Sequence, residues 1–93
     1  MLFLVHFARS STPVPAGEQA AIADRERDRA AELQREGVWR HLWRVTGRPE
    51  NVGVFEVDSN DHLHEVLSSL PMFPYADITI TPLSAHPAAV GTA

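Results

Sequence analysis

The sequence predicts an α+β fold, a four-stranded antiparallel sheet with two helices on one of its faces. The chain has 93 residues, of which 44% are hydrophobic and 22% charged, an ordinary composition for one small globular domain. Four short apolar or alternating runs are typical of strands, and two longer stretches are typical of helices. We predict a single domain over residues 1–93, with residues 84–93 as a loose or interface-bound tail.

The first half of the chain contains a buried strand and the longest helix. Residues 1–7 form a short apolar run, which suits a strand covered on both faces. Residues 9–17 are rich in Ser, Thr, Pro and Gly and predict a loop. Residues 16–36 are rich in alanine, and Gly37 stands where a helix commonly ends in a left-handed residue. A helix over residues 16–36 is therefore expected.

The second half predicts a hairpin, a shorter helix and a last strand. Residues 38–46 and 52–57 are strand-like and are separated by a Gly- and Pro-containing turn. Ser59 or Asn60 caps the next helix, whose apolar residues at helical spacing are Leu63, Val66, Leu67 and Leu70. Residues 76–83 alternate as a strand that Pro82 either terminates or places at a sheet edge.

The element order is strand, helix, strand, strand, helix, strand. This is the split βαβ pattern of a ferredoxin-like βαββαβ sandwich, with both helices on one face. The strands over residues 38–46 and 52–57 carry apolar side chains on both faces. An exposed apolar sheet face usually marks a protein interface, so we expect a homo-oligomer.

Composition excludes several functional classes. The net charge of −4 argues against nucleic acid and anionic membrane surfaces as partners. The chain has no cysteine, which excludes thiol chemistry and predicts a cytoplasmic protein. The apolar N-terminal run is far shorter than the ~18 residues of a membrane span. All eight basic residues are arginine, so acid–base chemistry has to come from Asp, Glu, His or Tyr75.

One carboxylate of the long helix lies on its apolar side. At about 100° per residue, Glu26 falls near the middle of an apolar stripe formed by Ile22, Ala23, Ala30 and Leu33. Desolvation there raises the pKa of a glutamate above its usual ~4.3, which suits a general base near neutral pH. The alternative is a structural ion pair with Arg25, Arg29 or a strand arginine.

Residues 39–44 (WRHLWR) concentrate aromatic and cationic side chains in one strand. Strict alternation would place Trp39, His41 and Trp43 on one face and Arg40 and Arg44 on the other. Two guanidinium groups on one face are suited to a small carboxylate ligand. The alternative is that the tryptophans anchor a core or interface and the arginines form ion pairs between subunits.

The histidines do not predict a metal site. His62 and His64 are two residues apart on a helix and point away from each other. His41 is either a proton carrier or a hydrogen-bonded core residue. Phosphate-binding glycine loops and a nucleophile elbow are absent from the sequence. Acid–base chemistry without cofactor or metal is therefore predicted.

Three segments resemble the muconolactone delta-isomerase family: residues 33–44 (LQREGVWRHLWR), 54–57 (VFEV) and 70–78 (LPMFPYADI). The resemblance extends over nearly the whole chain. It implies a small ferredoxin-like subunit that assembles into decamers, needs no cofactor and acts in the β-ketoadipate pathway of aromatic catabolism. The implied reaction converts (S)-muconolactone, a lactone carboxylate, to 3-oxoadipate enol-lactone by moving a proton from C4 to C2.

The resemblance also implies site residues. The family's base matches Glu26, and we expect Arg40, His41, Trp39 and Arg27 to bind the substrate, with Arg40 as the main partner of an anion. Arg27 belongs to a part of the helix where family members commonly carry lysine, a residue that this chain lacks.

Other departures leave alternatives open. Asn51 is followed by Val52 and Gly53 where an aromatic residue and a serine are usual in the family. The substrate pocket could therefore differ, and a chloromuconolactone dehalogenase remains an alternative. A non-catalytic ferredoxin-like oligomer that binds small molecules is another, because fold alone does not fix function.

Overall fold

The structure, a computed structural model, describes residues 1–91. Its elements along the chain are β1 (Leu2–Arg9), α1 (Gln19–Arg35), β2 (Trp39–Arg44), β3 (Asn51–Glu56), α2 (Asn60–Ser68), the short 3-10 helix η1 (Phe73–Tyr75) and β4 (Ala76–Leu83). Within this part of the chain, no helix is long and apolar enough to cross a membrane.

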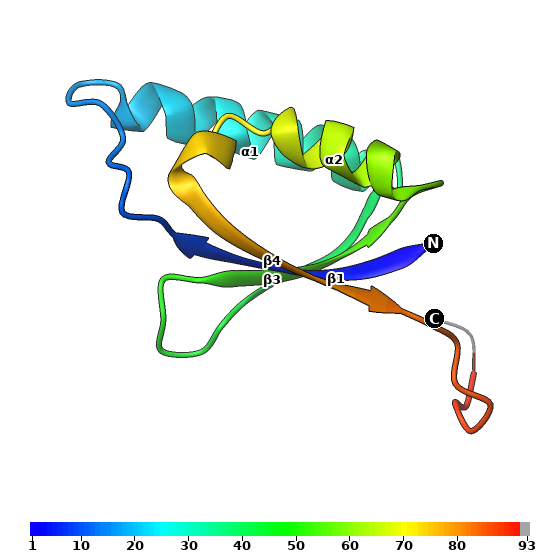
Figure 1. The fold of residues 1–93 in the computed structure, drawn as a ribbon. Coiled ribbons are helices and arrows are strands. Elements are labelled where there is room, and N and C mark those ends of the chain that lie inside the picture. Colours follow the sequence, from blue (N-terminus) through cyan, green and yellow to red (C-terminus); the bar gives the residue numbers. More distant parts are fainter. Residues whose placement is uncertain (92–93) are drawn as a thin grey trace.

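The four strands form one antiparallel sheet in the order β2-β3-β1-β4. Both helices lie on the same face of this sheet (Figure 1). The predicted α+β sandwich is thereby confirmed. The core between the layers contains Phe3, Val5, Phe55, Ala30, Leu33, Leu63, Val66, Leu67 and Leu70.

Helix α1 begins later than predicted and ends where predicted. Gly17 has a φ of +84°, and the Glu18 N–H donates to the Pro15 carbonyl, so a turn replaces the expected first helical residues. At the other end Gly37 has a φ of +78°. The N–H of Val38 donates to the Leu33 carbonyl, the Schellman arrangement that closes a helix.

A β-bulge in β2 interrupts the predicted alternation of this strand. Trp39 lies opposite Phe55 and His41 lies opposite Val54, so Arg40 is an extra residue without a partner on β3. Because side chains alternate between the two faces with a period of two, an extra residue exchanges the faces of all later positions. Trp39 therefore faces the helices, whereas His41 faces away from them.

The bulge corrects two predictions about faces. Arg44 lies on the helix-covered face with Trp39, whereas Trp43 lies on the opposite face, where its ring stacks on His41 at 5.2 Å. Trp39 thus does not share a face with His41 and Trp43, and Arg40 does not share one with Arg44. Strict alternation failed here because a bulge depends on pairing with another strand.

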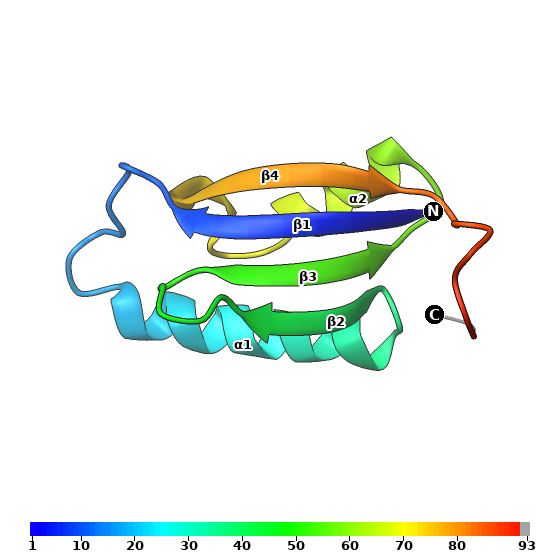
Figure 2. The ribbon, with the colours of Figure 1, turned by 90° about the horizontal axis from the view of Figure 1, so that it is seen from below.

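The sheet face without helices, which we call the outer face, is the one seen in Figure 2. Its central positions are largely apolar, and among its large side chains Trp43 is 54% exposed. Beyond β4, residues 84–91, the greater part of the predicted tail, form no helix or strand. Residues 92–93 of the predicted tail lie outside the described residues.

Candidate active site

Glu26 lies on α1 with its side chain turned toward the interior, as the helical stripe predicted. The side chain is partly buried, and its Oε1 accepts a hydrogen bond of 2.8 Å from the backbone N–H of Met72. Burial raises the pKa of this carboxyl group, and the hydrogen bond from Met72 opposes part of that rise. Within residues 1–91 Glu26 makes no ion pair with an arginine, contrary to the structural alternative.

A cavity of about 340 Å³ opens beside Glu26. It lies where α1, the turn before β4 and the ends of all four strands meet, and it is large enough for a small organic molecule. The residues that line it are Phe7, Ala8, Arg9, Glu26, Trp39, Arg44, Pro49, Asn51, Met72, Tyr75 and Ala76. Apolar walls with one carboxylate and two guanidinium groups suit a small anionic substrate.

A row of paired residues crosses the sheet at this end of the cavity. Arg44 of β2 lies opposite Asn51 of β3, and Asn51 lies opposite Phe7 of β1. Residues directly opposite in antiparallel strands place their side chains on the same face. Arg9, two positions after Phe7, lines the cavity as well. The C-terminal ends of β1 and β2 thus bring two arginines to one end of the sheet (Figure 2).

Trp39 forms a wall of the same cavity and is 4% exposed. The centroid of its ring system lies 5.6 Å from the ring centroid of Phe7 and 4.6 Å from that of Phe55. The indole lies over Gly53, where a Cβ atom would be 2.4 Å from the indole Nε1. A glycine is therefore required at this position for the indole to fit. The Nε1–H has no acceptor among the described residues.

The other three predicted substrate-binding residues do not line this cavity. Arg40 forms an ion pair with Glu56 at 3.1 Å on the outer face. His41 stacks on Trp43 on that same face. Arg27 is exposed on α1 and pairs with Asp24 at 3.3 Å. Within one subunit, Glu26 and Trp39 are brought together, whereas Arg40, His41 and Arg27 are not.

Several residues that line the cavity are not among those predicted from the sequence. The sequence predicts Arg44 only as a partner of Arg40, and it predicts a loop from Arg9 onward, although β1 continues to that residue. The backbone N–H of Met72 carries no sequence signal, because any residue except proline supplies one. Asn51 begins β3, and its role as the middle of the row follows only from strand pairing.

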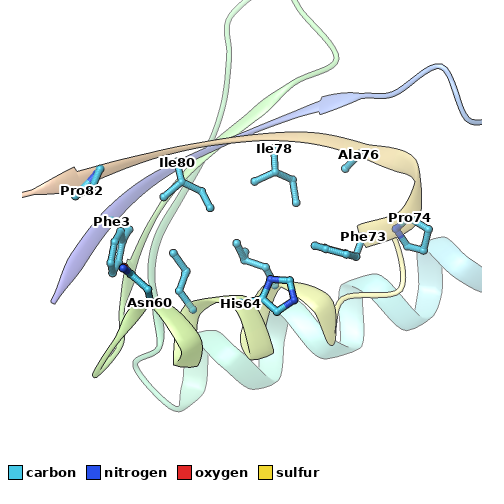
Figure 3. A pocket seen from close by; sticks show the side chains of 11 residues that line it. Phe3, Asn60, His64, Phe73, Pro74, Ala76, Ile78, Ile80 and Pro82 are labelled. Atoms are coloured by element: carbon cyan, nitrogen blue, oxygen red, sulfur yellow. The ribbon is translucent and has the colours of Figure 1, made fainter.

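A larger cavity, about 610 Å³, lies between α2 and β4. Figure 3 shows Ile78, Ile80 and Pro82 of β4 directed toward α2, with Phe73 at one end and His64 on the helix. His64 is the only ionisable side chain among the described residues that line it. This cavity lacks the carboxylate and the cations found beside Glu26, so the smaller cavity is the candidate active site.

The described part of the chain, residues 1–91, contains no cluster of three His, Asp or Glu side chains that could hold a metal ion. Arginine, which supplies both cations of the Glu26 cavity, stays protonated at any ordinary pH. The group of this cavity whose protonation changes in the acidic range is therefore Glu26. This arrangement can transfer a proton to or from a bound anion.

Comparisons with known proteins agree with the resemblance found in the sequence. The family model of muconolactone delta-isomerase matches residues 1–89. Muconolactone Delta-isomerase 2 of Acinetobacter lwoffii is 44% identical over 91 residues, which cover 97% of this chain and 95% of that protein. Muconolactone Delta-isomerase of Acinetobacter baylyi is 40% identical, and the match covers 97% of this chain and 95% of that protein.

The similarity extends to the fold. A crystal structure of muconolactone isomerase matches with a TM-score of 0.89 and 38% sequence identity. The match covers 100% of this chain and 98% of that one. The sheet and its two helices therefore belong to a fold that is shared with an isomerase of known structure. The chain is a member of the muconolactone delta-isomerase family.

Proposed function

We propose that this enzyme converts (S)-muconolactone to 3-oxoadipate enol-lactone, and that Glu26 is its base. The observation that carries the assignment of the base is the position of Glu26: a partly buried carboxylate beside a cavity that also holds two arginines. Family membership supports the substrate, since the matching relatives are named as muconolactone delta-isomerases. The pathway would be the β-ketoadipate route.

The proposed reaction is a 1,3-proton shift. The Glu26 carboxylate takes the proton from C4 of the lactone, and the electrons of the C4–H bond form the new C3=C4 double bond of a dienolate. The protonated carboxyl group then returns the proton to C2. The double bond moves from C2=C3 to C3=C4 without net gain or loss of protons or electrons, so the same carboxyl group serves as base and acid.

The environment of Glu26 supports this role in two ways. Burial raises its pKa, so the carboxylate is a stronger base than that of an exposed glutamate. The protonated carboxyl group can still return its proton to the substrate. The hydrogen bond from Met72 fixes Oε1. Because a positioned base avoids the entropy loss of finding its geometry during the reaction, this contact orients the group for proton transfer.

We extend the proposal to the assembly. The outer face carries exposed apolar groups, with Trp43 and Leu83 among them, and covering them would require a second subunit. A homo-oligomer, with the decamer that the family resemblance implies, is proposed. In such an assembly Arg40 and His41 would lie at or near a subunit contact, where they could approach a neighbouring site. A cytoplasmic location is part of the same proposal.

The test is turnover of (S)-muconolactone, followed by ultraviolet absorbance with an enol-lactone hydrolase as coupling enzyme. Wild type should turn over, and Glu26→Gln should lose about a hundredfold or more of kcat, the size expected for a missing general base. Asp28→Asn is the matched control, because Asp28 is an exposed acid of the same helix. It should retain wild-type kcat.

A parallel assay with a chlorinated muconolactone tests the alternative. The proposed isomerase should release no free chloride in proportion to turnover, whereas a dehalogenase would release one chloride per lactone. If the wild-type protein turns over neither the plain nor the chlorinated lactone, the proposed activity is overturned and a binding role is favoured.

A further inference from the structure

The charged groups of the Glu26 cavity are divided between two sides. Glu26 comes from α1, while Arg9 and Arg44 come from the ends of β1 and β2. Asn51 of β3 lies between Arg44 of β2 and Phe7 of β1. Since adjacent strands lie ~4.8 Å apart, the backbones of β1 and β2 are about 10 Å apart at this end. Glu26, Arg9 and Arg44 thus line the same cavity, although each comes from a different helix or strand.

Neither arginine is neutralised by another group of residues 1–91. Within residues 1–91, Arg9 and Arg44 make no ion pair or hydrogen bond through their side chains, in contrast to Arg29 and Arg48. Both are exposed, so a ligand that enters from solvent can reach them. A guanidinium group presents parallel N–H donors that match a carboxylate.

Glu26 forms no ion pair with Arg9 or Arg44 among residues 1–91. Its Oε1 is held by the backbone N–H of Met72 rather than by Arg44. An arginine bound to this carboxylate would lower its pKa and weaken it as a base. The cavity therefore keeps its base and its cations apart, and the positive charge stays available for a second carboxylate.

We propose that Arg44, assisted by Arg9, binds the carboxylate of the substrate and thereby sets C4 beside Glu26. This inference rests on the proposed function, because it names the group that recognises the lactone carboxylate. In muconolactone the carboxymethyl arm is attached to C4 itself. An arginine that holds the carboxylate of this arm therefore also restricts the position of C4, the carbon from which Glu26 removes a proton.

This assignment replaces the one predicted from the sequence. Arg40 was expected to bind the anion, but it pairs with Glu56 on the outer face. Arg44 reaches the cavity because the bulge at Arg40 shifts the alternation of β2 by one residue. Arg44 is therefore a specificity-determining residue: it should favour lactones that carry a carboxylate over neutral lactones of the same ring.

The experiment compares two substrates, (S)-muconolactone and the neutral 4-methylbut-2-en-4-olide, which keeps the C4 proton but has no carboxylate. With muconolactone, Arg44→Met should raise KM and lower kcat/KM about 10- to 100-fold, the loss expected for a hydrogen bond to a charged group. Arg44→Lys should recover part of this loss. With the neutral lactone, the change should stay within about twofold for both variants.

Binding without turnover gives an independent measurement. Calorimetric titration of Glu26→Gln with (S)-muconolactone provides a Kd in a protein that lacks the proposed base. Adding Arg44→Met to this background should weaken Kd about tenfold or more. Adding Arg35→Met, which removes an exposed arginine from the end of α1, should leave Kd unchanged. Thermal unfolding of each variant shows that it is folded.

The outcomes separate this inference from the proposed function. If wild type isomerises muconolactone and Arg44→Met leaves both KM and Kd unchanged, the role of Arg44 is overturned and the proposed function stands. An equal loss with the charged and neutral lactones would mean that Arg44 only maintains the structure, which also overturns it. If wild type neither binds nor isomerises muconolactone, both fall together.

Discussion

Glu26 on α1 accepts a hydrogen bond from the backbone N–H of Met72, a residue 46 positions further along the chain. The contact joins the first helix to the turn that precedes β4. It holds a carboxyl group whose pKa is raised by burial at the edge of a cavity. The same carboxyl group is therefore oriented by one interaction and made more basic by another.

The pH dependence of activity should report this environment. Because Glu26 has to be deprotonated to take the C4 proton, kcat/KM should rise with pH through the pKa of the free enzyme's base. Burial raises that pKa, so the midpoint should lie above the ~4.3 of an ordinary glutamate. The measurement is kcat/KM for muconolactone from pH 4 to pH 8. A midpoint at or below 4.3 would contradict the assignment.

Glu26 should also make stability depend on pH. Its pKa is higher in the folded state than in the unfolded chain, so the folded state binds more protons between the two values. The free energy of unfolding therefore falls as pH rises through this window. Below the unfolded pKa the destabilising effect is absent, and above the folded pKa it is complete.

Glu26→Gln removes this titration and retains an oxygen that can accept from Met72. The variant should therefore gain stability relative to wild type as pH is raised from 4 to 8. Urea unfolding at both pH values measures the two differences, with Asp28→Asn as the control for a change in net charge. A difference that is the same at pH 4 and pH 8 would count against a raised pKa.

Gly53 should be essential for the wall that Trp39 forms. A Cβ at this position would lie 2.4 Å from the indole nitrogen and 2.9 Å from the carbonyl oxygen of His41. Gly53→Ala should destabilise the protein by about 1–3 kcal/mol, the usual cost of overpacking. It should also change the fluorescence of Trp39, measured in a Trp43→Phe background during urea unfolding.

Gly47→Ala is the matched control for that substitution. Gly47 has a φ of +78° and nothing within 4 Å of a Cβ, so its replacement costs about 1–2 kcal/mol through the backbone alone. The fluorescence of the folded protein should stay as in the parent. A Gly53→Ala variant with parental stability and fluorescence would show that the indole does not depend on this close approach.

The outer face should hold the subunits together. Trp43 is 54% exposed in the single chain and stacks on His41, on the part of that face formed by the edge strand β2. Trp43→Glu should shift the protein to a lower mass in sedimentation velocity, because a charge buried at an interface without a partner is costly. Ala21→Glu adds the same charge on the exposed side of α1 and should leave the mass unchanged. An unaltered mass for Trp43→Glu would place the interface elsewhere.

Local patterns were sufficient for the fold. The apolar run of β1, the alanine-rich stretch of α1 and the helical spacing from Leu63 to Leu70 each predict one element, and their order leaves few ways to build a sheet. Gly37 predicts the end of α1 because helices commonly end in a residue with left-handed backbone conformation, which glycine adopts easily since it has no Cβ atom. The inward position of Glu26 also follows from helical periodicity alone.

Tertiary structure decided which arginine shares a cavity with that glutamate. Alternation along β2 placed Arg40 and Arg44 on one face, whereas the bulge, which exists only through pairing with β3, puts them on opposite faces. The partner of Glu26, the N–H of Met72, likewise comes from a distant turn that only folding brings near. Periodicity along one element can be read from the sequence because it is local geometry. The register between strands depends on contacts between distant residues, and it determines the chemistry of this site.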